Sequence, residues 1–124
     1  MNIVNAWEEG GWEWVVEAHP SYEGGVALTL LKRPKGGTFH KWTPQNWMDF
    51  APPFNMTIGY FSPVKITIFH YSDWIDKMLY GTFEHRVNKV VARMKKIATA
   101  FVKCQDAEAA RRKKSQDLIN RIKQ

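Results

Sequence analysis

The sequence predicts an α+β domain, in which an antiparallel sheet of about five to six strands in residues 3–71 carries a long C-terminal α-helix on one face. Short apolar runs punctuated by Gly doublets and Pro fill the first part of the chain. Residues 83–124 contain neither Pro nor Gly and keep a helical repeat. Strands followed by helices are typical of this class, and the helix is long enough to project beyond a small sheet.

Length and composition favour one folded domain. A chain of 124 residues suffices for a single core and is too short for two ordinary domains. The 44% hydrophobic content and the six Trp are typical of a folded protein. We therefore expect a single domain over residues 1–124, divided into a β-rich scaffold (1–71) and a basic helical part (72–124).

The first predicted element is a β-hairpin. Two runs, 3–8 and 12–18, flank a turn at 9–11 that contains two Gly. The second run alternates, with Glu13 and Glu17 on one face and the apolar residues on the other: Trp12, Trp14, Val16 and Ala18. This alternation predicts a strand with a buried apolar face and an acidic face toward water.

Further strands are expected along the chain. Residues 26–33 form an apolar run ended by Pro34 and two Gly, and residues 38–42 would be a short partner. The runs 56–61 and 64–71 are rich in β-branched and aromatic residues, which favours two more strands.

Three helices are predicted from start signals. Thr43 followed by Pro44 suits an N-cap and a first helical position, which predicts a short helix over 44–50. A second short helix is expected over 74–80, ended by Gly81. Thr82 then caps the long helix.

Apolar residues recur along one side of the long helix at spacings of four and three: Phe83, Val87, Val90, Met94, Ile97, Phe101 and Cys104. This stripe predicts packing on the sheet. Beyond Cys104 the same register holds polar residues, so the segment should leave the body or bend. The stripe returns at Leu118, Ile119 and Ile122, which predicts that the segment folds back or that another molecule, including a second copy, covers it.

Charge is distributed unevenly around the total of +6. Residues 1–70 hold five Lys or Arg against six Asp or Glu, whereas residues 71–124 hold thirteen against six. A basic C-terminal part favours a nucleic acid, an acidic protein surface or an anionic membrane as partner.

The basic residues suggest how such a partner would be bound. A row of cations adjoins the apolar stripe and continues into a basic run: Arg86, Lys89, Arg93, Lys96 and Lys103, then Arg111, Arg112, Lys113 and Lys114. Such a row is often just the solvated face of an amphipathic helix. Because almost no acid interrupts it, we expect nucleic-acid binding through phosphates, with little sequence preference.

Two other binding functions remain open. One is a small accessory protein, such as those of viruses or mobile elements, that modulates or inhibits a partner protein through the projecting helix or an exposed Trp-rich surface. The other is reversible docking on an anionic membrane. In the first case Leu118, Ile119 and Ile122 would form the partner or homodimer contact.

Catalytic patterns are missing from the sequence. The four His are scattered without metal-ligand spacing, and no Gly-rich phosphate loop is present. His70 with Asp73 is the least implausible acid–base pair, and Cys104 lies on the apolar stripe. We expect no enzyme, no cofactor and no metal. One Cys, no signal peptide and no membrane span favour the cytoplasm.

Overall fold

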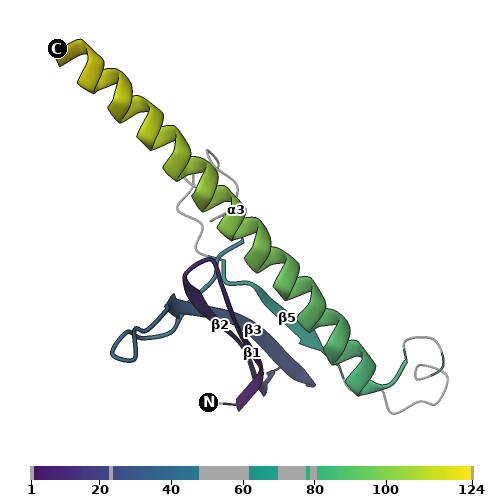
Figure 1. Ribbon diagram of the computed structural model, residues 1–124. Coiled ribbons are helices and arrows are strands. Elements are labelled where there is room, and N and C mark those ends of the chain that lie inside the picture. Colours follow the sequence, from purple (N-terminus) through teal and green to yellow (C-terminus); the bar gives the residue numbers. More distant parts are fainter. Residues whose placement is uncertain (1, 23, 48–61, 70–77, 79–80, 124) are drawn as a thin grey trace.

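The computed structural model describes residues 2–22, 24–47, 62–69, 78 and 81–123. A curved sheet carries one long helix, whose C-terminal half extends past the sheet edge (Figure 1). The elements are β1 (Asn2–Glu9), β2 (Trp12–Pro20), β3 (Val26–Pro34), β4 (Thr43–Pro44), β5 (Lys65–Ile68) and α3 (Phe83–Lys123). The predicted α+β architecture is confirmed.

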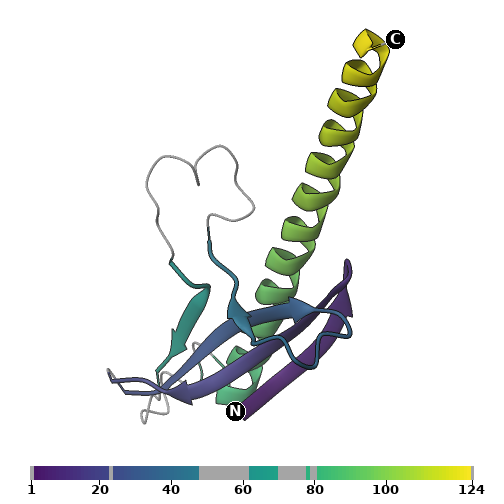
Figure 2. The same ribbon diagram turned by 90° about the vertical axis from the view of Figure 1, so that its left-hand side faces the viewer.

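Within the described residues the sheet has five strands, all paired antiparallel. Its order is β1-β2-β3-β4, and β5 also pairs with β3. The predicted hairpin is present, with Trp7 opposite Trp14 and Glu9 opposite Trp12. A register shift between Ile3 and Asn5 bulges β1 near its start. Figure 2 shows β1 at one margin of the sheet.

The short helix predicted over 44–50, with Thr43 as its N-cap, is wrong over its described residues 44–47, which are not helical. Thr43 and Pro44 pair with Lys32 and Leu31 as β4, and the Thr43 hydroxyl donates to the Lys32 carbonyl at 3.0 Å. That hydroxyl therefore serves a strand and caps no helix. Pro44 tolerates the position because an edge strand does not need its missing N–H. The short strand expected at 38–42 is likewise absent, since those residues form turns and irregular structure.

Several predictions fall partly outside the described residues. The strand at 56–61 lies wholly outside them, as do 48–50 of the expected helix. Of the run 64–71, Lys65–Ile68 forms β5. In the short helix expected at 74–80, Met78 alone is described, and it is helical.

The core lies between the sheet and the first half of α3. Trp14, Leu28 and Met94 are fully buried at this contact. Their neighbours in the cluster are Val16, Leu30, Val64, Ile68, Val91, Ile97, Ala98 and Phe101. Trp14 packs edge-on against Phe101, with ring centroids 5.8 Å apart. Packing of the apolar stripe on the sheet is therefore confirmed.

The opposite face of the sheet is less polar than predicted. Glu13 and Glu17 do lie on it, since they alternate with the core residues of β2. Val15 lies between them and is 2% exposed, and its cross-strand partner Leu31 is 8% exposed. This face is therefore part-apolar and part-acidic.

The ends of the packed half of α3 are fixed by specific contacts. The amide of His85 donates to the Thr82 hydroxyl at 3.2 Å, which confirms the predicted cap. At the other end, the turn between β1 and β2 lies so close to α3 that a Cβ on Gly10 would collide with Val102. Gly10 also has φ +63°, a conformation that favours glycine.

Beyond Cys104, α3 continues without a break for more than four turns. Every residue from 105 to 123 is exposed. We call this segment, residues 105–123, the tail. The prediction that it leaves the body is confirmed, and it extends about 27 Å from Gln105 at 1.5 Å per residue.

Candidate nucleic-acid interface

An extended charged surface runs along α3 on the side turned away from the sheet. At about 100° per residue, seven of its cations fall within an arc of about 80°. We call this set the cationic stripe: Lys89, Arg93, Lys96, Lys103, Arg111, Lys114 and Arg121. It extends about 48 Å along the axis. All seven residues are exposed, and the residues buried against the sheet occupy the opposite side.

No carboxylate neutralises this stripe within the described part of the chain. The ion pairs found there join other residues, and the stripe cations contact no acid at salt-bridge distance. Ala100, Ala107 and Leu118 fall within the same arc, and Ala92 and Ala110 lie about 20° beyond its edge. Short side chains would let a large polyanion approach the helix backbone closely.

The structure separates the nine predicted cations into two groups. Six belong to the stripe, and Arg86, Arg112 and Lys113 do not. Arg86 is half-buried at the start of α3, where its guanidinium donates to the Phe69 carbonyl at 2.8 Å. Lys113 is exposed but turned about 100° from Lys114, because neighbours on a helix point in different directions.

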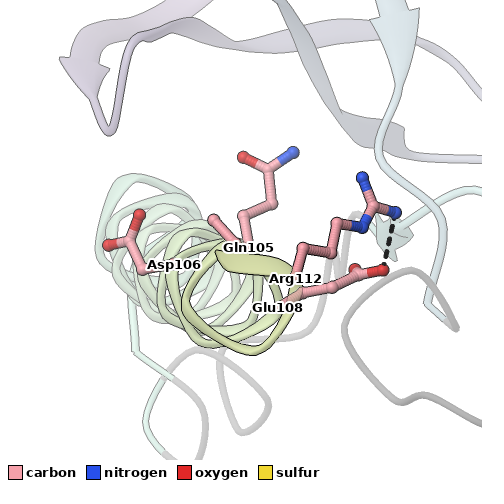
Figure 3. Close-up of a pocket in the computed structure, with 5 residues that line it drawn as sticks. Gln105, Asp106, Glu108 and Arg112 are labelled. Carbon is pink, nitrogen blue, oxygen red and sulfur yellow. Dashed lines mark hydrogen bonds and ion pairs between the residues drawn. The ribbon is translucent and has the colours of Figure 1, made fainter. Parts of the chain in front are cut away.

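Arg112 is engaged by an acid one turn earlier on the helix. Its Nη2 donates to Glu108 Oε1 at 2.8 Å. Figure 3 shows this pair on one side of the helix, beside a hollow that Gln105 also lines, with Asp106 on the other side. The run Arg111–Lys114, one cluster in the sequence, is thus spread around the helix. Of the four residues in this run, only Arg111 and Lys114 belong to the stripe.

Sequence reasoning missed Arg121. It lies seven residues after Lys114, a spacing that returns a helix to nearly the same face. That spacing was the available signal. Lys95 was rightly left out of the row, since its ammonium group lies over the Trp7 ring at 5.4 Å from the centroid.

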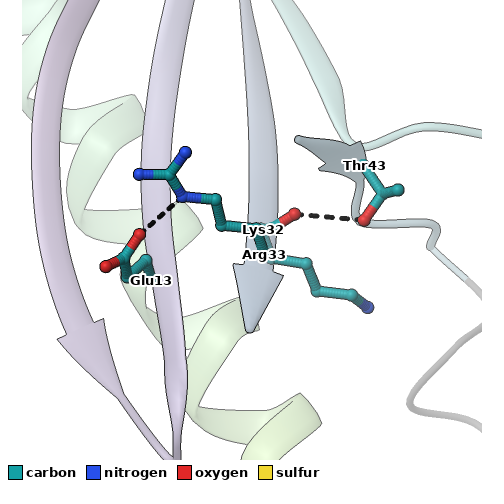
Figure 4. A network of polar contacts seen from close by, with 4 residues as sticks. All are labelled: Glu13, Lys32, Arg33 and Thr43. Atoms are coloured by element: carbon teal, nitrogen blue, oxygen red, sulfur yellow. Dashed lines mark hydrogen bonds and ion pairs between the residues drawn. The ribbon is translucent and has the colours of Figure 1, made fainter. Parts of the chain in front are cut away.

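Two further cations, Arg33 at the end of β3 and Lys35 just after it, are paired with acids. Arg33 Nε lies 2.6 Å from Glu13 Oε2, and Lys35 Nζ lies 3.1 Å from Glu8 Oε2. The Arg33 hydrogen bond holds the pKa of the Glu13 carboxyl below its ordinary value. Figure 4 shows Arg33 and Lys32 projecting from opposite sides of β3.

Lys32 belongs to the packed side of the sheet. It is 8% exposed, and its Nζ donates to Gln45 Oε1 at 2.7 Å. The same ammonium group lies 3.7 Å from the Phe101 ring centroid and 5.3 Å from that of Trp12. This lysine therefore stabilises the contact of sheet and helix through cation–π packing and is not a surface cation.

The described Trp residues offer no exposed stacking platform. Trp14 is buried, and Trp7, Trp12, Trp42 and Trp47 are half-buried. Trp7 stacks on Trp14 with ring centroids 6.3 Å apart, and Arg33 covers the Trp42 ring at 4.2 Å. A Trp-rich binding surface therefore gains no support from the described tryptophans.

An apolar patch lies near the end of the tail. Its members are Leu118, Ile119 and Ile122, whose exposed fractions are 57%, 44% and 83%. Within the described residues the tail does not fold back to cover them, so this alternative from the sequence is excluded. The apolar face of the first half of α3 is occupied by the sheet and is unavailable to a membrane.

Neither a metal centre nor a spanning helix emerges from the described residues. No three His, Cys, Asp or Glu side chains gather there as metal ligands. No described helix is long and apolar enough to cross a bilayer. Comparisons of the chain with protein-family models, with curated proteins and with solved structures find no match.

Proposed function

We propose that the protein is a non-catalytic module that binds nucleic acid through the cationic stripe, with little sequence preference. The observation that carries this proposal is the stripe itself: seven exposed cations on one side of a continuous helix, none of them within salt-bridge distance of an acid in the described residues. Rows of Lys and Arg neutralise phosphates and release condensed counterions, which gives affinity without reading bases.

The salt dependence of binding measures how many cations take part. If all seven contact phosphates, the logarithm of the association constant for a duplex should fall with the logarithm of salt concentration at a slope of about −6. Fluorescence anisotropy with a labelled random-sequence oligonucleotide gives this slope. A slope near zero would show that phosphates do not drive the association.

A matched pair of variants tests whether the nucleic acid binds on the side of α3 that carries the cationic stripe. Arg111→Gln with Lys114→Gln removes two stripe cations, whereas Arg112→Gln with Lys113→Gln removes two cations of the same run that point elsewhere. We expect the first variant to lower the slope magnitude by about 2 and the second to lower it by clearly less. Equal losses would show that total charge matters and that the stripe does not.

The second candidate is a protein-binding function of the apolar patch. Three large apolar side chains exposed on one end of a helix favour a contact with another protein or a second copy. Leu118→Ser, Ile119→Ser and Ile122→Ser together should then abolish self-association measured by light scattering, while the circular dichroism of the body stays unchanged. If the parent protein is monomeric, self-association is excluded, and the patch could then bind only a different protein.

A further inference from the structure

We propose that the preferred ligand of the cationic stripe is double-stranded DNA, with the tail lying in the major groove. This inference rests on the proposed function and adds the form of nucleic acid. It depends on the clearance around the tail, on the charges and small side chains of its exposed face, and on the absence of aromatic residues from residues 105–123.

The tail has the clearance that a groove demands. An α-helix with its side chains is about 10–12 Å wide, and the major groove of B-form DNA is about 12 Å wide and 8.5 Å deep. Only a helix free on its flanks can enter it. Every residue of the tail is exposed, and the hydrogen bonds found beyond Gln105, which Trp12 contacts, are local to the helix. The first half of α3 is backed by the sheet and can contact phosphates only from outside.

The composition of the inserted face suits the groove. Arg111, Lys114 and Arg121 lie on the tail, with Ala107 and Leu118 in the same arc and Ala110 just outside it. The two alanines keep the first turns of that face low, while the long cations can reach phosphates at the groove edges. Duplex RNA fits less well because its major groove is deep and narrow.

The tail lacks the side chains that normally hold a single-stranded nucleic acid. Proteins that bind single strands stack bases on aromatic side chains beside cations. The tail contains no aromatic residue, and none of the described Trp is exposed. A flexible strand would also lose conformational freedom along a straight helix, whereas a duplex is already stiff and carries a higher charge density.

The test compares four probes of one sequence in the same salt series: a 24-base-pair DNA duplex, each of its DNA strands, and the corresponding RNA duplex. We expect the DNA duplex to bind at least tenfold more tightly than the other probes. A single strand or RNA duplex that binds equally well would overturn this inference while the proposed function stands. If none of the probes binds, the proposed function fails, and this inference fails with it.

Two triple variants then locate the preference. Arg111→Gln, Lys114→Gln and Arg121→Gln should reduce the ratio of duplex to single-strand affinity to within threefold of unity. Lys89→Gln, Arg93→Gln and Lys96→Gln remove the same charge from the sheet-backed half and should weaken both probes while keeping the ratio. A tail variant that keeps the parent ratio would exclude groove insertion by the tail. Circular dichroism verifies that both variants remain helical.

Discussion

Trp12 Nε1 donates a hydrogen bond to Gln105 Oε1 at 2.9 Å, joining the hairpin to the last turn of α3 that touches the sheet. Residues before this bond share the core, and residues after it have only local support. That support consists of the Glu108–Arg112 ion pair, a Gln116–Asn120 side-chain hydrogen bond at 3.1 Å and the high helix propensity of several alanines. Each of the two side-chain pairs stabilises the helix by about 0.2–0.5 kcal/mol.

Amide hydrogen exchange should therefore divide α3 in two. An unpacked helix as short as the tail is marginally stable in water, whereas residues 91–101 are held by the core. Amides of residues 107–123 should exchange orders of magnitude faster than those of 91–101, as measured by mass spectrometry on peptide fragments. Equal protection in the free protein would mean that something covers the tail, as self-association through the apolar patch requires.

Substitution of Met94 should destabilise the fold strongly. Met94 is fully buried at the centre of the contact between α3 and the sheet. Met94→Ala leaves a cavity and should cost about 2–5 kcal/mol of unfolding free energy in urea titrations. Leu118→Ala on the same helix should change it by less than about 0.5 kcal/mol, because Leu118 is exposed. Comparable losses would contradict the placement of the core.

Gly10 and Gly11 provide a comparison of backbone strain with close packing. Both have positive φ, but only a Cβ at Gly10 would meet Val102. Gly11→Ala should cost about 1 kcal/mol for its conformation alone. Gly10→Ala should cost about 1–3 kcal/mol more, since the turn must move away from α3. Adding Val102→Ala to Gly10→Ala should remove part of this difference, and no recovery would place the turn away from the helix.

Glu13 should make stability depend on pH. The Arg33 hydrogen bond lowers the pKa of Glu13 in the folded state, so folding favours the ionised carboxylate. The resulting stabilisation is present at neutral pH and is lost as the pH falls through the folded pKa. The difference in urea midpoint between the parent and Glu13→Gln should therefore shrink as the pH is lowered from neutral into the acid range. Glu17→Gln, on the same face of β2, is the matched control; an identical pH profile would exclude the Arg33 bond as the cause.

The elements that sequence reasoning found were those with strong periodicity. The hairpin follows from alternation around two Gly, and α3 follows from a long uninterrupted repeat. Thr43–Pro44 was misjudged because the same dipeptide suits a helix start and an edge strand. Which one forms depends on Lys32 and Leu31 across the sheet, and a local signal cannot contain that information.

In the candidate site, too, some features could be predicted from the sequence and others could not. Exposure of the basic residues followed from the break in the apolar stripe after Cys104. Their grouping did not, because Arg111, Arg112, Lys113 and Lys114 were treated as one cluster although a helix spreads them around its axis. Burial of Lys32 was predictable, since Leu28, Leu30 and Lys32 alternate onto one face of β3. Its cation–π contact with Phe101 depends on how α3 docks.

The exposed alanines in and beside the stripe allow its charge to be changed without repacking the core. Ala92, Ala107 and Ala110 are exposed and support no neighbouring element in the described structure. A glutamate at any of them is a good helix former and would place an anion among the cations. Affinity for a polyanion could then be attenuated in graded increments while the scaffold keeps its stability, so that selection can act on the two properties separately.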